Sequence, residues 1–166
     1  MNRSFRNYVQ LREGQYWGSE GAGILAIASD TGKWLVAHRS PRVKQPNTWG
    51  VVGGKIDPHE LPSAAARREF REETGYPGHV NTVEIYKWIA PEKLSDGTTP
   101  KFVYYNFLGE IVKGDWEPVK NFETSEFRWC SYEELVALEP KHFGLAALLD
   151  NKSDIIREVS LRHQQR

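Results

Sequence analysis

Residues 53–76, GGKIDPHELPSAAARREFREETGY, place three glutamates, Glu69, Glu72 and Glu73, very close together. Alanine, arginine and glutamate dominate this stretch and favour a helix, which we predict over residues 63–74. On a helix, residues three and four apart share a face, so the three carboxylates should project from one side. The stretch therefore predicts a helix with a concentrated negative charge.

Like charges at this spacing repel one another, and two arrangements can relieve the repulsion. Arg67, Arg68 and Arg71 can neutralise the carboxylates, which would make the segment an ordinary salt-bridged surface helix. Alternatively, a divalent cation can bind among them, because Mg²⁺ prefers oxygen ligands from carboxylates, water and phosphates. The helix alone is compatible with both interpretations.

The residues around the helix favour the second interpretation. The constrained positions are Gly54, Glu60, Arg68-Glu69-Phe70, Glu72-Glu73 and Gly75-Tyr76. Their spacing resembles the Nudix box, which combines a glycine, a glutamate, an REUxEE core with an apolar U, and a closing glycine with an apolar residue. The resemblance covers residues 21–138, with valine at position 52 where many members have proline.

The resemblance implies a fold, a reaction and a cofactor. The expected fold is α/β (α+β), with a mixed β-sheet sandwiched between α-helices. The expected reaction is hydrolysis of a nucleoside diphosphate linked to another moiety, by attack of water at phosphorus. Mg²⁺ or Mn²⁺ is the implied cofactor, since this chemistry needs charge neutralisation on phosphate oxygens and an oriented water.

The family's roles transfer to matching positions of this chain. The implied metal ligands are the Gly53 carbonyl, Glu69, Glu72, Glu73 and Glu123. Arg68 is expected to orient a glutamate of the box, and Glu60 to support the loop before the helix or bind metal through water. Glu123 is chosen because it lies six residues before Trp129, with Glu126 as the alternative. The implied catalytic residues are Glu72, Glu123 and Arg68, and the general base is either Glu72 or Glu123.

The substrate is less defined by the sequence. Arg39, Arg42 and Lys55 are the predicted substrate-binding residues, because arginine and lysine suit phosphate. In the strand at residues 101–108, Phe102, Tyr104 and Asn106 alternate with Val103, Tyr105 and Phe107, and one of the two faces is a candidate wall for a base or sugar. Core packing is the alternative for that face. Nucleoside triphosphates, nucleotide sugars and ADP-ribose all remain candidate substrates. Pro91 is a weak marker of ADP-ribose as the substrate.

Other elements follow from local patterns. Pro62 and Gly75 are placed to begin and end the central helix, and Ser131 with Glu134 forms a capping box. Predicted strands cover residues 22–29, 33–39, 49–54, 79–90, 101–112 and 126–131, with a short strand near 8–11. Further helices are predicted over residues 131–138, 142–150 and 153–164. The first two strands of the main series form an expected hairpin.

The length, charge and cysteine content of the whole chain limit the class of protein to which it can belong. Its 166 residues suit an N-terminal arm, residues 1–20, and one Nudix domain, residues 21–166. Twenty-two basic and 22 acidic residues balance, which counts against nucleic acid as a partner and against cleavage of capped RNA. The single Cys130 and the absence of a signal-like or spanning apolar segment indicate a cytoplasmic protein with no membrane contact.

A small nucleotide is the expected partner, and a homodimer is an assembly that the sequence leaves open. The alternative from another class is a nucleotide-sensing Nudix domain without catalysis. The intact set of box glutamates counts against that alternative.

Overall fold

The computed structural model describes residues 20–43, 45–89 and 103–165. Several features named from the sequence lie outside these ranges. They are the expected strand near residues 8–11, the loop that contains Pro91, the single residues Lys44 and Phe102, and the expected arm apart from Glu20. Among the described residues, none of the helices combines the length and apolar character needed to cross a bilayer.

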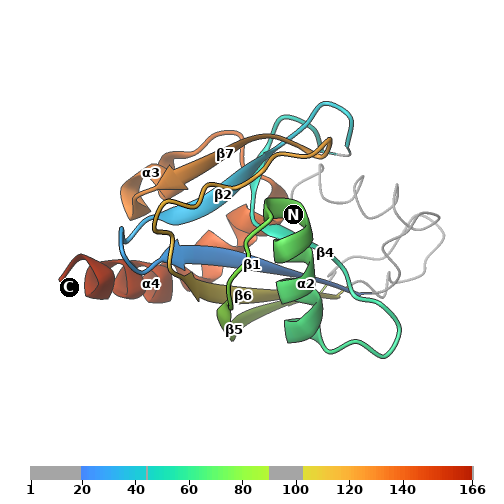
Figure 1. Ribbon diagram of the computed structural model, residues 1–166, viewed down its shortest axis with the longest axis horizontal. Helices are drawn as coiled ribbons and strands as arrows, with labels where there is room; N and C mark the ends of the chain where they lie inside the picture. Colours follow the sequence, from blue (N-terminus) through green and yellow to red (C-terminus); the bar gives the residue numbers. More distant parts are fainter. Residues whose placement is uncertain (1–19, 44, 90–102, 166) are drawn as a thin grey trace.

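A mixed sheet is the centre of the molecule (Figure 1). Its strands are β1 (Glu20–Ala28), β2 (Trp34–Arg39), β3 (Trp49–Gly50), β4 (Val52–Lys55), β5 (Asn81–Ile89), β6 (Val103–Ile111) and β7 (Thr124–Cys130). The order β3-β2-β1-β6-β5 forms the main path, with β4 paired to β1 and β7 paired to β2. Parallel pairing occurs between β1 and β6, and the other pairs of named strands are antiparallel.

Helices cover both faces of this sheet, as predicted. The helices are α2 (Pro62–Thr74), α3 (Tyr132–Ala137) and α4 (Phe143–Gln164). Buried side chains of β1 alternate between two cores: Ile24 packs in the cluster that holds Phe70 of α2, whereas Leu25 packs in the cluster that holds Leu145 of α4. This alternation is the period-two pattern of a strand buried on both faces. Figure 1 shows α2 crossing one face of the sheet.

Most of the predicted elements are confirmed. The β1–β2 hairpin forms, and Gly32 in its turn has a φ of 68°. Helix α2 begins at Pro62, and Gly75 ends it in the left-handed conformation with a φ of 74°. The capping box of α3 is present with both of its hydrogen bonds.

The two predicted C-terminal helices form one element, α4, with non-helical backbone at Lys152. This break falls between the two predicted ranges, residues 142–150 and 153–164. The pattern of the sequence therefore located the discontinuity, although the helical segments are continuous in the chain.

The single strand predicted over residues 49–54 is wrong. Two strands occur instead, because β3 pairs with β2 whereas β4 pairs with β1, and Val51 lies between them. Gly53 and Gly54 therefore belong to a paired strand rather than to a turn. Their lack of a side chain serves close packing against neighbouring atoms.

Candidate active site

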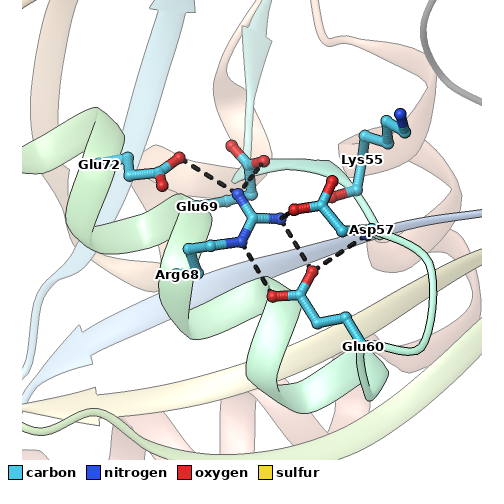
Figure 2. A network of polar contacts seen from close by, with 6 residues as sticks. All are labelled: Lys55, Asp57, Glu60, Arg68, Glu69 and Glu72. Atoms are coloured by element: carbon cyan, nitrogen blue, oxygen red, sulfur yellow. Dashed lines mark hydrogen bonds and ion pairs between the residues drawn. The ribbon is translucent and has the colours of Figure 1, made fainter.

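Arg68 is the centre of a polar network that joins α2 to the loop before it (Figure 2). Its Nε donates to Glu60 Oε2 and its Nη2 donates to Glu60 Oε1, both at 2.9 Å. Its Nη1 donates to Glu69 Oε1 at 2.8 Å and to Glu72 Oε2 at 3.2 Å. Nη2 also donates to the carbonyl of Lys55 at 3.0 Å. One guanidinium thus links three glutamates to the end of β4.

The network stabilises the charges of Glu60 and Arg68. Hydrogen bonds from Arg68 lower the pKa of Glu60, although burial opposes the shift, and a bond from the Asp57 backbone N–H adds to it. The same bonds raise the pKa of Arg68 above its already high ordinary value. A two-bond arginine–carboxylate pair also fixes orientation. Glu60 therefore anchors Arg68 in this structure, which favours the supporting role expected for it.

A cleft of about 410 Å³ opens beside this network. It lies where α2, β4 and the end of β2 meet the segment before β7. Its lining residues are Ala37, Arg39, Val43, Val51, Gly53, Gly54, Lys55, Glu69, Glu73, Glu123 and Thr124. Three carboxylates and two cationic side chains therefore share one cleft, although they come from four separate parts of the sequence.

The carboxylates of the cleft influence one another. Burial raises the pKa of Glu73 well above its ordinary value, and the negative charges of Glu123 and Glu69 raise it further while Arg39 opposes them. Burial also raises the pKa of Glu69, against the lowering effect of Arg68. Crowded carboxylates with raised pKa values gain from a nearby cation, because a positive charge favours their ionised form.

The donor set suits a hard divalent cation, since carboxylate and carbonyl oxygens are the ligands that Mg²⁺ and Mn²⁺ prefer. As the side chains stand, no three acidic, imidazole or thiol groups of the described residues converge closely enough to hold a metal ion. A physical reason is visible in Figure 2, where Glu69 and Glu72 both turn toward Arg68. The chemistry of the cleft fits the metal, but the glutamates are arranged around the guanidinium.

Gly54 and Glu69 touch at the floor of the cleft. A Cβ atom added to Gly54 would lie 2.5 Å from Glu69 Cδ and 2.6 Å from Glu69 Oε2. Real Cβ atoms do not approach other atoms so closely, and any other residue would displace the carboxylate. Because Gly54 has no side chain, the Glu69 carboxylate can occupy this space.

The structure brings together most, but not all, of the predicted site residues. Gly53, Glu69, Glu73, Glu123, Arg39 and Lys55 all line the cleft. Glu72 is more exposed and lies outside this lining, held by Arg68. Arg42 is exposed on the loop after β2, also outside the lining. Glu126, the alternative to Glu123, bonds to Arg128 at 3.0 Å.

The aromatic strand has mixed surroundings. Asn106 of β6 is buried, and its Oδ1 has no hydrogen-bond partner among the described residues. Tyr104 lines a second pocket with an enclosed volume of only about 30 Å³, together with Arg39, Val51, Gly53 and the start of α4. This slot has room for little more than water and is too small for a base as it stands.

Other candidates have structural roles. Cys130 is buried, and burial raises the pKa of its thiol to about 11, so it is a packing residue rather than a nucleophile. Trp49 is buried and stacks beneath Arg128, with 4.3 Å between the guanidinium carbon and the ring centre. Neither group faces the carboxylate cleft.

Sequence reasoning missed several residues of the site. Val43 and Thr124 line the cleft, and Asp57 joins the Arg68 network at 3.5 Å from Nη2. Asp57 lies three residues before Glu60 in the box loop, a spacing that allows its N–H to reach the Glu60 carboxylate. That local spacing was a usable signal, whereas Val43 and Thr124 carry none.

Comparisons with known proteins identify the family of the chain. A family model described as NUDIX domain matches residues 19–151. A Mycobacterium tuberculosis protein, provisionally named 8-oxo-dGTP diphosphatase 3, is 31% identical over 139 residues, covering 80% of this chain and 61% of the relative. Nucleoside triphosphatase NudI of Enterobacter is 26% identical over 120 residues, covering 70% of this chain and 85% of the relative. The chain spans about three fifths of the Mycobacterium relative's length.

Solved structures show the same fold. The Nudix hydrolase RenU of Mycobacterium smegmatis superposes with a TM-score of 0.65 and 28% identity, covering 82% of this chain and 84% of that one. A MutT Nudix hydrolase of Burkholderia pseudomallei superposes with a TM-score of 0.62 and 20% identity, covering 80% and 96%. The family match over residues 19–151 decides the class: the chain belongs to the NUDIX domain family.

Proposed function

We propose that the protein is a divalent-metal-dependent pyrophosphohydrolase that acts on nucleoside triphosphates or related nucleotide-linked diphosphates. One observation carries the proposal: Glu69, Glu73 and Glu123 line one cleft with Arg39, Lys55 and the Gly53–Gly54 backbone. The first group suits a cation and the second suits phosphate oxygens. A bound pyrophosphate needs both at once.

The proposed role of each residue follows from its position in or beside the cleft. The Gly53 carbonyl, Glu69, Glu72, Glu73 and Glu123 are the candidate ligands of Mg²⁺ or Mn²⁺. When bound, the cation would supply charge neutralisation on the phosphate oxygens and would make water a better nucleophile. Arg39 and Lys55 place positive charge on the wall where the phosphates would lie. Arg68 holds Glu69 and Glu72 in fixed orientations through its own hydrogen bonds.

A general base must accept a proton from the attacking water, and two glutamates are candidates. Glu123 is exposed and lines the cleft, so it can reach a water there without leaving its position. Glu72 is tied to Arg68 and would have to exchange that bond first. The geometry favours Glu123 as the base.

Two relatives favour nucleoside triphosphates among the candidate substrates. The Mycobacterium tuberculosis protein is named for 8-oxo-dGTP and the Enterobacter protein for nucleoside triphosphates. Nucleotide sugars and ADP-ribose lack such support here and serve as comparison substrates. We expect the products of a triphosphate to be a nucleoside monophosphate and pyrophosphate.

The test is release of phosphate and pyrophosphate from a panel of standard and oxidised nucleoside triphosphates, nucleotide sugars and ADP-ribose, with Mg²⁺ or Mn²⁺. Glu123→Gln is expected to lower kcat by roughly 100-fold or more. Glu126→Gln, on the same segment but paired with Arg128, is the matched control and should turn over normally. Tight nucleotide binding without turnover of any compound would instead establish a sensing domain.

A further inference from the structure

Tyr104 reaches across β1 to the glycine that faces the cleft. In the sheet, Gly23 of β1 lies beside Gly53 of β4, and Tyr104 of β6 lies beside Gly21 of β1. A Cβ atom added to either Gly23 or Gly53 would collide with the Tyr104 hydroxyl oxygen. The end of the tyrosine therefore occupies the space that both glycines leave open.

The two glycines differ in what else surrounds them. At Gly23, the other near neighbours of an added Cβ are side-chain atoms, Tyr104 Cζ at 3.1 Å and Val51 Cγ2 at 3.0 Å. At Gly53, they are backbone atoms, the Ala22 carbonyl oxygen and Gly23 Cα, the latter at 2.5 Å. Removing the tyrosine hydroxyl can therefore relieve the first position but not the second.

Tyr104 and Gly53 also share the wall between two cavities. Gly53, Val51 and Arg39 line both the carboxylate cleft and the narrow slot behind it, whereas Tyr104 lines only the slot. The tyrosine hydroxyl thus packs against the far side of the backbone whose near side forms the cleft. A movement of this side chain is therefore expected to change the position of Gly53.

We propose that Tyr104 is a positioning residue, whose hydroxyl end packs against Gly23 and Gly53 and fixes the Gly53–Gly54 backbone at the floor of the cleft. The consequence for metal binding rests on the proposed function, in which the Gly53 carbonyl is a ligand. The consequence for backbone position does not rest on the proposed function, because it follows from packing alone.

The first experiment compares Tyr104→Phe with Tyr105→Phe. Both remove one hydroxyl from β6, but Tyr105 packs on the opposite face, with the core beneath α2. Tyr104→Phe should speed amide hydrogen exchange at Gly53 and Gly54 in the metal-free protein. It should also weaken Mn²⁺ binding, measured by calorimetry without substrate, by roughly tenfold. Tyr105→Phe should change neither quantity.

The second experiment tests the contact itself by a double-mutant cycle. Gly23→Ala should lower the melting temperature by roughly 5 °C through overpacking. Adding Tyr104→Phe should recover most of that loss. The same addition should not rescue Gly53→Ala, whose collisions with backbone atoms remain.

The outcomes separate the two proposals. Unchanged exchange at Gly53 and Gly54 in Tyr104→Phe, or the absence of rescue at Gly23, would overturn the positioning role. Faster exchange and rescue, in a protein that hydrolyses no nucleotide, would support the positioning role and reject only the proposed function.

Discussion

Arg68 and Glu60 form a two-bond fork, with Nε donating to Oε2 and Nη2 donating to Oε1, each at 2.9 Å. Glu60 belongs to the loop before α2, and Arg68 belongs to the second turn of the helix. The fork fixes the guanidinium on one side, and its remaining N–H groups then hold Glu69 and Glu72. The orientation of Glu69 in the cleft, and of Glu72 beside it, therefore depends on a contact outside the cleft.

The first prediction concerns this fork. Arg68→Lys keeps the charge but replaces a planar five-donor group by a single ammonium, so the geometry cannot be reproduced. Because both partners are partly exposed, we expect a loss of about 1–2 kcal/mol in the free energy of unfolding, measured with urea. Arg71→Lys, at an exposed position of the same helix, is the control and should change little. Equal unfolding free energies for the two variants would contradict the prediction.

The second prediction follows from the lowered pKa of Glu60. A carboxylate whose pKa is depressed by folding adds stability that is fully present above its ordinary value of 4.5 and is lost as the pH falls through the folded-state pKa. Acidification from about pH 5 to about pH 3 should therefore destabilise the native protein more steeply than Glu60→Gln. Urea unfolding across this range measures how the free energy of unfolding of each protein changes with pH. Equal pH dependence in the native protein and in Glu60→Gln would argue against a role for Glu60.

The third prediction concerns Glu73, whose effect on stability changes with pH in the opposite direction. Its pKa is raised by burial and by Glu123 and Glu69, so stability is lost as the pH rises above its ordinary value of 4.5. Without divalent metal at neutral pH, Glu73→Gln should therefore melt at a higher temperature than the native protein. With Mg²⁺ present, its activity should be roughly 100-fold lower, because a candidate ligand is lost.

Glu126→Gln is the control for both measurements, since that carboxylate is exposed and paired with Arg128. A Glu73→Gln protein that is less stable than the native one, with and without metal, would show that the carboxylate is needed for folding instead.

The sequence was sufficient for the helix and its ends, because these depend on local chemistry. Pro62 and Gly75 have the backbone preferences that begin and end α2, and Ser131 caps α3 within three residues. The spacing of Glu69 and Glu73 on one helix face was equally local. The family resemblance then supplied the layered arrangement, which the two cores on either side of β1 confirm.

Contacts between distant segments could not be predicted in this way. The parallel pairing of β1 with β6 and the break at Val51 depend on which strands become neighbours, and no local pattern encodes that. The same limit hid the contact of Tyr104 with Gly53 across β1. The arginine contacts, by comparison, are local: Arg68 was expected to orient a glutamate of the box, and it bonds to both Glu69 and Glu72.

The last prediction uses the contact between Gly54 and Glu69. In Gly54→Ala, the new methyl group would overlap the Glu69 carboxylate, which is the far end of a side chain and can move aside by giving up its bond to Arg68. Stability should change by less than about 1 kcal/mol, because alanine also restricts the unfolded chain. Activity should fall about tenfold, because the displaced carboxylate no longer lines the cleft correctly. In a Glu69→Gln background the added methyl should cost much less activity, since the group it displaces is already impaired. Full additivity of the two losses, measured as kcat/KM, would show that Gly54 acts through something other than Glu69.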